Sequence, residues 1–448
     1  MAELNGNHTR KSLISLLKTY ERDLQLSIKS ITDYLEENGM SDISSDVGAT
    51  NLSLPPTAPT SVLEARQNLI SSAYTIQQIA TEPAEYIPYL AIHYQVLSCF
   101  QWLIRFNILP IIPLTGSISY GEIAEIAKVS EDQLRRVIRM VITSNLLAEP
   151  SPNQVAHNAV SSTFVKQPGF MSWAKFMITY SAPTAASFAD ASEKWGDTVK
   201  KNETAFNVAF STDKPFFDYL AQSAELTETF AAYMKSVQGS YGTSLKHLVN
   251  GFDWDGLGEA TVVDVGGSTC ASSIALADAY PSLQFVVQDL PDTIKNAPAV
   301  LSKQPASIQA RIKTQPYDFF TVQKHHDADV YMLRMILHDW PAEIAINILK
   351  NQLPALRASY PRSRLLVMDT VLPTPGSDSA SIVDEALLRV RDLTMMQTFN
   401  SKEREVGDFI DIFSKAADEH GYLYLKSISK PVGSVMSIME VGYRPYPL

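Results

Sequence analysis

The spacing of apolar residues divides the chain into a helical first part and an alternating second part. Over residues 11–38 apolar side chains recur every three or four positions, which gives a helix one apolar face. Residues 41–61 are rich in Ser, Pro, Thr and Asp and predict a linker, and a second helix is expected to follow as far as about residue 81. The almost continuously apolar stretch 89–104 predicts a further helix, buried or at a subunit contact.

The stretch from residue 118 to 158 is typical of a winged helix. Two helical patterns meet at a turn over 128–129, Ser130 is placed to cap the second helix, and a hairpin over 150–158 would form the wing. The second helix carries three arginines that raise a DNA-binding interpretation: Arg135, Arg136 and Arg139. Acidic residues surround them, so we favour a dimerisation scaffold.

From residue 260 onward short apolar strands alternate with helical segments. This alternation predicts an α/β fold with parallel units, and the last two strands are close enough in sequence to form a hairpin at the sheet edge. The strands are expected at 261–265, 284–288, 328–333, 364–368, 422–428 and 434–441.

Composition and charge narrow the classes of function. The chain has 448 residues, enough for two or three domains, and its net charge of −11 argues against binding to nucleic acid. The two cysteines, Cys99 and Cys270, make no disulfide framework, and no Cys/His cluster has the spacing of a metal site, so no metal is expected. The first residues lack the apolar core of a signal peptide, and 89–104 is too short and too polar to cross a membrane. We therefore expect a cytoplasmic protein without a membrane partner.

A glycine turn after the first strand of the second part is the strongest candidate for chemistry. Residues 261–268 read TVVDVGGS, a buried strand that contains Asp264 and runs into Gly266 and Gly267. The next strand stops at Asp289, 23 residues after Gly266. Such a turn lets the backbone approach a ligand closely, and an acid at the end of the next strand can bind ribose hydroxyls, so the pair suits a nucleoside-bearing cofactor. An ordinary turn in a doubly wound sheet is the alternative.

Three further segments complete the pattern: RMILHDW at 334–340, VMDTVLP at 367–373 and NSKERE at 400–405. Together with DVGG at 264–267 and QDLP at 288–291, they resemble the S-adenosylmethionine-dependent O-methyltransferases of plant caffeate type. The long N-terminal extension resembles the fungal branch of this family, which acts on secondary metabolites and includes methyltransferase-like pericyclases. The resemblance runs from about residue 60 to the C-terminus.

The resemblance implies a Rossmann-like class I methyltransferase sheet with an all-α, winged-helix N-terminal dimerisation domain. Four regions are then expected along the chain. They are a helical extension and linker (1–60), a winged-helix-like dimerisation domain (61–165), a helical substrate-pocket region (166–250) and a Rossmann-like catalytic domain that binds S-adenosylmethionine (251–448).

The resemblance also assigns roles to single residues. His338 matches the general base, and Asp369 and Glu403 match the two acids that hold its ring. The implied cofactor residues are Asp264, Gly266, Gly267, Asp289, Leu290, Asp318, Phe319 and Arg334. The implied substrate residues are Phe230, Met234, Met395 and Asn400. Taken singly, each type also has a structural interpretation: His338 as a helix cap, Glu403 as a solvated loop charge, and the Phe and Met residues as core.

This assignment is chemically reasonable for methyl transfer to a hydroxyl. A neutral phenol is a poor nucleophile, and a histidine with an ordinary pKa of about 6.5 can take its proton close to neutral pH. A carboxylate on the other ring nitrogen fixes the tautomer and stabilises the imidazolium. Two positions depart from the family pattern, since Ser268 and Cys270 stand where glycines are common, and Cys270 is expected to lower cofactor affinity. Arg334 replaces a lysine but keeps the charge.

Three functions are compatible with these residues. The first is O-methylation of a phenolic or enolic hydroxyl on a small-molecule polyketide or alkaloid. The second is a pericyclase that keeps the cofactor unreacted while His338, Arg391 or the sulfonium polarises a carbonyl. The third is an inactive, cofactor-binding interaction protein. Because the apolar N-terminal helices would leave an exposed patch on a lone subunit, we also expect a homodimer.

Overall fold

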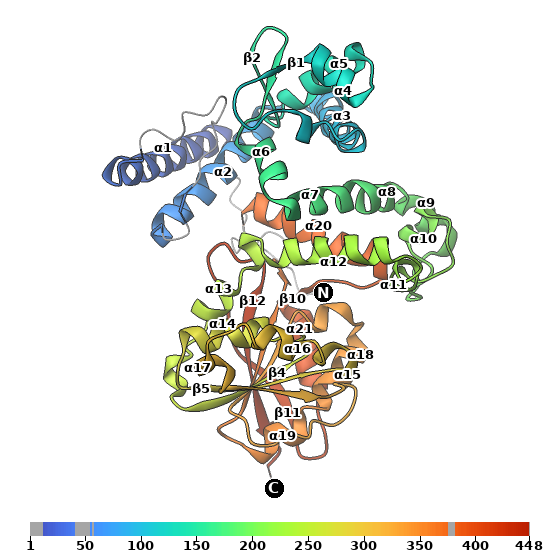
Figure 1. Cartoon of the computed structure of the whole chain (residues 1–448). Helices are drawn as coiled ribbons and strands as arrows, with labels where there is room; N and C mark the ends of the chain where they lie inside the picture. The colour runs from blue at the N-terminus through green and yellow to red at the C-terminus, as the bar shows by residue number, and fades with distance from the viewer. Residues whose placement is uncertain (1–11, 41–53, 56–57, 375–380, 448) are drawn as a thin grey trace, which may run out of the picture. The chain divides into compact units, whose positions relative to one another are not determined.

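The computed structural model describes residues 12–40, 54–55, 58–374 and 381–447 (Figure 1). Most of the expected linker over 41–61 lies outside these residues. The chain divides into two compact units of non-contiguous segments: unit 1 comprises Met1–Thr179, Thr229–Ser236 and Ser381–Val383, and unit 2 comprises Tyr180–Glu228, Val237–Ala380 and Asp384–Leu448. The region expected over 166–250 is therefore shared between the two units.

Unit 1 begins with two long helices that pack against each other, α1 (Leu13–Glu37) and α2 (Thr60–Ala80). The helix predicted over 11–38 is confirmed as α1, whose first turn is capped by Ser12. The apolar stretch at 89–104 lies in α3 (Tyr86–Arg105), but only the C-terminal half of that helix has buried residues. Among the residues described, no helix combines the length and apolar character needed to span a bilayer.

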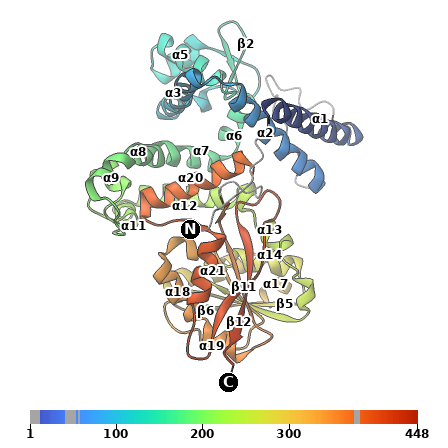
Figure 2. The same cartoon turned by 180° about the vertical axis from the view of Figure 1, so that it is seen from behind.

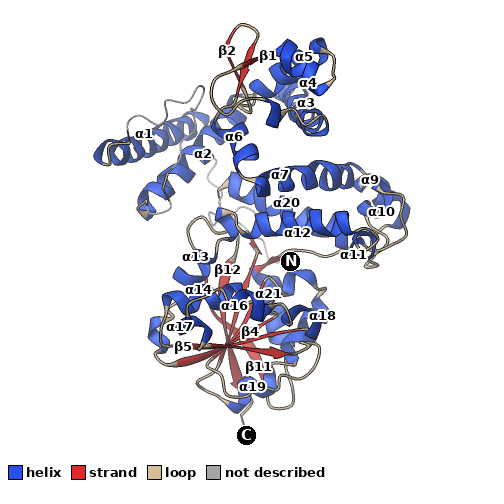
Figure 3. Cartoon of the chain, in the orientation of Figure 1, coloured by secondary structure: helices blue, strands red, loops and turns tan. Residues whose placement is uncertain are grey.

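The winged helix predicted over 118–158 is present (Figure 3). It consists of β1 (Ile118–Ser119), α4 (Tyr120–Ala127), α5 (Glu131–Ile142), β2 (Ala148–Ser151) and β3 (Gln154–Ala156), with the strands in the order β1-β3-β2. Lys128 takes a left-handed conformation between the two helices, and Ser130 caps α5 as expected. The unit continues into α6 (Ala159–Lys166) and α7 (Pro168–Phe176).

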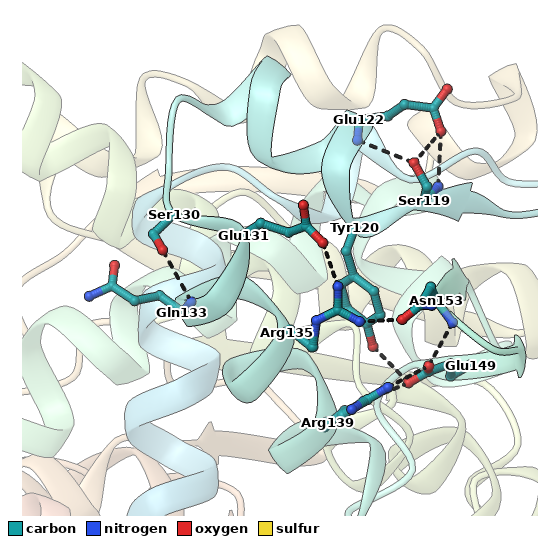
Figure 4. Close-up of polar contacts among 10 residues, drawn as sticks. All are labelled: Ser119, Tyr120, Glu122, Ser130, Glu131, Gln133, Arg135, Arg139, Glu149 and Asn153. Atoms are coloured by element: carbon teal, nitrogen blue, oxygen red, sulfur yellow. Dashed lines mark hydrogen bonds and ion pairs between the residues drawn. The ribbon is translucent and has the colours of Figure 1, made fainter.

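All three arginines of α5 are paired within the winged helix, as Figure 4 shows for two of them. Arg139 makes two hydrogen bonds to the Glu149 carboxylate, at 3.0 and 2.9 Å, and the Tyr120 hydroxyl donates to the same carboxylate at 2.8 Å. The remaining pairs are Arg135 with Glu131 and Asn153, and Arg136 with Asp132. These cations neutralise their own neighbours, which leaves a weak electrostatic footprint for nucleic-acid phosphates.

Between the winged helix and the first strand of the sheet the chain forms the π-helical turn η3 (Met177–Ser181), α8 (Ala182–Ala186), α9 (Phe188–Trp195), α10 (Ala205–Ala209), α11 (Phe216–Leu220), α12 (Ala224–Gln238) and α13 (Leu245–Asn250). A further long helix, α20 (Ile382–Phe399), follows much later in the chain. Aromatic side chains dominate the packing around α10 and α11, where Phe206 contacts the rings of Phe210, Phe216 and Tyr219.

Unit 2 is built on a seven-stranded sheet in the order β11-β12-β8-β7-β4-β5-β6. Its strands are β4 (Ala260–Val265), β5 (Leu283–Asp289), β6 (Ile312–Pro316), β7 (Val330–Arg334), β8 (Arg364–Asp369), β11 (Gly421–Ser429) and β12 (Ser437–Pro445). Five strands are parallel, and the antiparallel β11–β12 hairpin closes one edge (Figure 2). The α/β sheet and its edge hairpin are confirmed. Two details of the expectation were wrong, because β6 was not predicted and β12 begins and ends later than 434–441.

Helices cover both faces of this sheet. One core joins the sheet to α18 (Ala342–Lys350), α19 (Leu353–Ala358) and α21 (Val406–Lys415). The other joins it to α13, α14 (Ala271–Ala279), α15 (Pro291–Ile294), α16 (Ala297–Leu301) and α17 (Ala306–Gln309). A two-stranded ladder, β9 (Val371–Leu372) with β10 (Arg404–Glu405), brings the segment around residue 404 to the end of β8.

Candidate active site

The strand order places the predicted site residues along one edge of the sheet. β4 lies between β5 and β7, so the chain order reverses there, and ligands of doubly wound sheets bind at such a switch point, at the carboxyl ends of the strands. Gly266 follows β4, while Asp289, Arg334 and Asp369 end β5, β7 and β8, and Asp318 follows β6. The topology therefore collects residues that are as much as 105 positions apart, from Asp264 to Asp369, into one region of unit 2.

The glycine turn is held tightly against its neighbours. The N–H groups of Gly266 and Gly267 both donate to the Gln288 carbonyl, at 2.8 and 3.1 Å. Gly266 has a φ of +76°, and a Cβ at this position would lie 2.6 Å from the Cδ1 atom of Ile336. A side chain is excluded here by both conformation and space, and the turn packs directly against the segment that carries His338.

Asp264 of β4 packs against the glycine turn. It is buried and accepts a hydrogen bond from the Ser273 hydroxyl at 2.8 Å. Burial raises its pKa to about 6, although the Ser273 hydrogen bond and the charge of Arg334 favour the ionised form. Arg334 donates from Nη2 to the Thr243 carbonyl at 2.9 Å, while its buried Nε has no hydrogen-bond partner among the described residues.

Asp289 and the residues after β5 and β6 surround the same turn. The Asp289 carboxylate accepts from the N–H groups of Ser268 and Leu290, at 2.9 and 2.8 Å, and stays partly exposed. Leu290 is 49% exposed beside it. The Phe319 ring is also near the turn, 3.8 Å from the position that a Gly266 Cβ would take, and Asp318 orders this loop by accepting from the N–H of Phe320 at 2.9 Å.

The two departures from glycine both lie in left-handed backbone. Ser268 has a φ of +49° and Cys270 a φ of +72°, and non-glycine residues adopt this region at a cost of about 1–2 kcal/mol. Cys270 is fully buried at the start of α14, and burial raises the pKa of its thiol to about 12. The thiol is therefore a packing group, because only the thiolate is reactive.

His338 lies after β7 with its imidazole between carboxylates. Its Nδ1 is 3.3 Å from Oε1 of Glu403, and its Nε2 is 3.6 Å from Oδ1 of Asp339. Burial lowers the pKa of His338, but the charge of Asp369, the hydrogen bond to Glu403 and the charge of Asp339 outweigh it and raise the pKa to about 9. The sequence-based expectation of an ordinary pKa was therefore wrong, because the buried Asp369 and Glu403 and the more exposed Asp339 together favour the imidazolium.

Asp369 acts on His338 through its charge. The two side chains share no hydrogen bond. Instead Oδ2 of Asp369 accepts from the backbone N–H of Leu337 at 3.1 Å, and Oδ1 is buried without a hydrogen-bond partner among the described residues. Burial raises the pKa of Asp369 to about 6. Arg391 of α20 adds a cation beside Glu403, with its Nε 3.7 Å from Oε1 of that carboxylate.

Sequence reasoning missed two residues that hold the His338 segment. The Ser401 hydroxyl donates to the His338 carbonyl at 2.9 Å, and the buried Arg404 guanidinium donates to the carbonyls of Leu337 and Trp340. Both residues stand in the NSKERE motif, but an arginine beside a catalytic-type glutamate in a loop gives no sign in sequence that its side chain is buried.

The predicted substrate residues fall into different parts of the structure. Phe230 and Met234 lie on α12 in the stretch that belongs to unit 1, where the Phe230 ring is 5.5 Å from that of Phe176. Met395 is half-buried on α20 in unit 2. Asn400 has a φ of +50°, and its amide donates to the carbonyls of Lys200 and Glu203, at 2.7 and 3.2 Å, so in this structure it pins the loop after α9.

Unit 2 has a cavity of about 340 Å³ next to this loop. Its walls come from α9, the loop that follows it, the start of α18 and residues 400–402. The cavity does not include His338 or the glycine turn, although Ser401 lines it and also bonds the His338 carbonyl. It is therefore adjacent to the segment that carries the imidazole rather than centred on the imidazole.

The residues at the strand ends fit S-adenosylmethionine. A partly exposed carboxylate, Asp289, suits the two ribose hydroxyls, and the exposed Leu290 and the Phe319 ring offer apolar surface for a base. Arg334 carries a buried Nε without a hydrogen-bond partner among the described residues, so its guanidinium retains donor capacity for a carboxylate.

Family models match the chain in two regions. A model described as an O-methyltransferase domain matches residues 193–419. A second model, described as the N-terminal domain of the trypacidin cluster transcriptional coactivator tpcD, matches residues 14–81.

Curated proteins from fungi are similar over nearly the whole chain. The O-methyltransferase VdtC of Byssochlamys spectabilis is 45% identical over 429 residues, which cover 95% of this chain and 97% of that protein. The O-methyltransferase aurJ of Gibberella zeae is 42% identical over 436 residues, 96% of this chain and 98% of that protein.

Solved structures share the fold at lower identity. OxaC matches with a TM-score of 0.69 at 19% identity, over 96% of this chain and 100% of that one. LepI, solved in complex with SAM, matches with a TM-score of 0.67 at 20% identity, over 94% of this chain and 100% of that one.

Proposed function

Because this chain belongs to the S-adenosylmethionine-dependent O-methyltransferase family, we propose that it methylates a hydroxyl group of a fungal secondary metabolite of polyketide or alkaloid type, with His338 as the general base. The observation that carries the proposal is the buried imidazole at the switch point of the sheet, with Nδ1 against Glu403. Family membership makes the chain an enzyme, so the alternative of an inactive interaction protein is set aside.

The geometry around His338 favours proton removal at Nε2. Glu403 engages Nδ1, which selects the tautomer with a proton on Nδ1 and a lone pair on Nε2. A substrate O–H then gives its proton to Nε2, and the imidazolium that forms is stabilised by the charges of Asp369, Glu403 and Asp339. A phenol with a pKa near 10 is closer to an imidazole with a pKa of about 9 than to an ordinary histidine, so the transfer costs little free energy.

The cofactor residues would hold S-adenosylmethionine at the adjacent strand ends. Asp289 would accept hydrogen bonds from the ribose hydroxyls, and Arg334 would face the carboxylate of the cofactor. Leu290, Asp318 and Phe319 would flank the adenine ring. Asp264, Gly266 and Gly267 would shape the turn on which the cofactor lies. Bound there, the cofactor supplies an electrophilic methyl group. The protein contributes orientation and removal of the hydroxyl proton.

A second candidate function is pericyclic catalysis with the cofactor unreacted. The raised pKa of His338 favours it, because an imidazole that is protonated at neutral pH can donate a hydrogen bond to a substrate carbonyl. The Arg391 cation also lies close to the Glu403 carboxylate that contacts this imidazole. The two functions predict different protonation states of one residue in the working enzyme.

Substrate binding and assembly are part of the proposal. Phe230, Met234, Met395 and Asn400 would contribute to the substrate pocket, Asn400 by fixing the loop after α9. We also propose a cytoplasmic homodimer. Its support is a row of exposed apolar side chains on α3 at helical spacing: Ile87, Leu90, Tyr94 and Leu97, which are 69, 49, 58 and 36% exposed.

Product mass and label distinguish the two functions. Purified protein is incubated with methyl-labelled S-adenosylmethionine and a panel of hydroxylated naphthalenes, hydroxypyridones and fungal extracts. Label in a product supports methyl transfer, and the His338→Ala variant should then lose about 10²- to 10⁴-fold in rate. A rearranged product of unchanged mass and without label would replace methyl transfer by the pericyclic function. Full transfer activity in the H338A variant would remove the proposed base.

A further inference from the structure

Arg404 is a buried cation that the proposed reaction does not use. It is 1% exposed and is among the largest fully buried side chains of the described chain. Burying a guanidinium costs several kcal/mol unless hydrogen bonds and opposite charges compensate it, and an apolar side chain of similar size would often serve stability as well. We therefore expect Arg404 to have a role beyond packing.

Two of its nitrogens donate to the backbone on either side of His338. Nη1 donates to the carbonyl of Leu337 and Nη2 to the carbonyl of Trp340, while Nε makes no hydrogen bond within the described residues. The 3-10 turn η6 (Leu337–Asp339) begins at the first of these residues and ends directly before the second. A planar guanidinium with a fixed angle between its donors can set the separation of two acceptors, which the single ammonium of a lysine cannot.

Other contacts of the same segment act on the same turn. The Ser401 hydroxyl donates to the carbonyl of His338 at 2.9 Å, and Glu403 lies 3.3 Å from the imidazole Nδ1. Residues 401, 403 and 404 thus contact the backbone before His338, its own carbonyl, its ring and the backbone after it. The ladder between β9 and β10 fixes this segment to the end of β8.

We propose that Arg404 is a positioning residue that fixes the imidazole of His338 by holding the Leu337 and Trp340 carbonyls, with Ser401 as its partner. The inference rests on the proposed role of His338 as the base. A base must lie within hydrogen-bond reach of the proton it takes, and a displacement of about 1 Å can cost on the order of 10²-fold in rate. Arg404 acts through the backbone and does not touch the reacting atoms.

The test compares Arg404→Lys with Arg311→Lys as a matched control. Arg311 also donates to backbone carbonyls, those of Tyr280, Leu283 and Ala277, but it precedes β6 at the amino ends of the strands, away from the site. Because R404K keeps the charge, an electrostatic role alone would leave activity intact. We expect kcat with the best phenolic acceptor to fall about 10- to 100-fold, the KM for S-adenosylmethionine to stay the same, and R311K to lower the Tm without lowering kcat.

Ser401→Ala keeps the test usable if R404K does not fold. It removes one hydroxyl from the same turn and should lower kcat about 3- to 10-fold at unchanged cofactor affinity. Wild-type kcat in R404K, or an equal loss of kcat in R404K and R311K, would overturn the inference. So would wild-type kcat in S401A if only that variant can be purified.

A readout without turnover separates this inference from the proposed function. The His338 imidazole is titrated by NMR in protein labelled at histidine. The charges that face it are Asp369, Glu403 and Asp339, and Arg391 is paired with Glu403. We expect the titration in R404K to move by about one pH unit toward that of an ordinary histidine, because the ring is no longer held against these acids. If wild-type protein transfers no methyl group, the proposed function fails. An unmoved titration of His338 in R404K separately overturns the positioning role of Arg404.

Discussion

Replacement of Glu403 by glutamine measures how strongly the carboxylate raises the proton affinity of His338. Glutamine keeps the size and one acceptor oxygen of the side chain but removes its negative charge. The Glu403 side chain is 1% exposed, so water screens its charge weakly. The wild-type imidazole should titrate at about pH 9.

The size of the change follows from the contact. Nδ1 of His338 lies 3.3 Å from Oε1 of Glu403, and a hydrogen bond to a charged group contributes roughly 1.5–3 kcal/mol. Since one pKa unit corresponds to about 1.4 kcal/mol, E403Q should lower the pKa of His338 by about one to two units. The charges of Asp369 and Asp339 remain and keep the value above that of an ordinary histidine.

The assay is an NMR titration of protein labelled at histidine, from about pH 5.5 to 10. The chain has 8 histidines, so the signal that H338A lacks identifies His338. Glu405→Gln is the control, because Glu405 belongs to the same segment but caps the first turn of α21. The rising limb of kcat against pH should shift to lower pH in E403Q by the same amount as the titration.

The pH dependence of the free energy of unfolding tests the same effect of Glu403 on His338. The folded-state pKa of His338 lies above its unfolded value, so the stability it contributes is full below about pH 6.5 and is lost as the pH rises through about 9. E403Q should lose less stability over that window than wild type. An E403Q titration within about 0.3 pH units of wild type, or an equal shift in E405Q, would refute the account of this site.

Three further predictions concern the cofactor turn, the winged helix and the subunit contact. Ser268→Gly should raise the free energy of unfolding by about 0.5–1 kcal/mol, because the relief of a left-handed serine outweighs the added chain flexibility, and it should not weaken cofactor binding measured by calorimetry. The control Thr269→Gly, at a position without a positive φ, should lower the free energy of unfolding. A destabilised S268G would contradict the strain at Ser268. Glu149→Gln should lower the Tm without changing cofactor affinity, because Glu149 accepts hydrogen bonds from Arg139, Tyr120 and the Asn153 N–H. The hydrogen bonds from Arg139 help to lower the pKa of Glu149 to about 2, so wild type should lose this stabilisation as the pH falls from about 4.5 toward 2. An E149Q variant whose melting temperature depends on acid pH as in wild type would argue against it. Ile87→Asp should convert a dimeric mass in light scattering to a monomeric one, while Val199→Asp, at 76% exposure in unit 2, should not; a monomeric wild type would exclude the homodimer.

Much of the fold could be predicted because its signals are local. The buried strands after residue 260 are short apolar runs, and the winged helix shows its turn at Lys128 and its cap at Ser130 in sequence. β6 was missed because it is an edge strand with one buried residue, Ile312, and reads as polar. Edge strands need little apolar surface, so hydrophobic pattern detects them poorly.

The sequence could identify the residues of the site but not the pKa of the imidazole among them. The motifs brought His338, Glu403 and Asp369 together in the expected region, but the raised pKa of the imidazole depends on the burial of Asp369 and Glu403 and on the charge of the more exposed Asp339. Asn400 was expected to line the substrate pocket, and its bonds to the carbonyls of Lys200 and Glu203 depend on a loop 200 residues away. Long-range contacts of this kind leave no periodic signal in the chain.

The most direct test of the central claim is the transfer of a labelled methyl group from S-adenosylmethionine to a phenolic acceptor by wild type and H338A, measured across pH 6 to 10. We predict label on the acceptor oxygen, a rate that rises with pH toward about 9 in wild type, and a loss of about 10²-fold or more in H338A. A wild-type rate that does not depend on pH, or an H338A variant that keeps the wild-type rate, would contradict the assignment of His338 as the base.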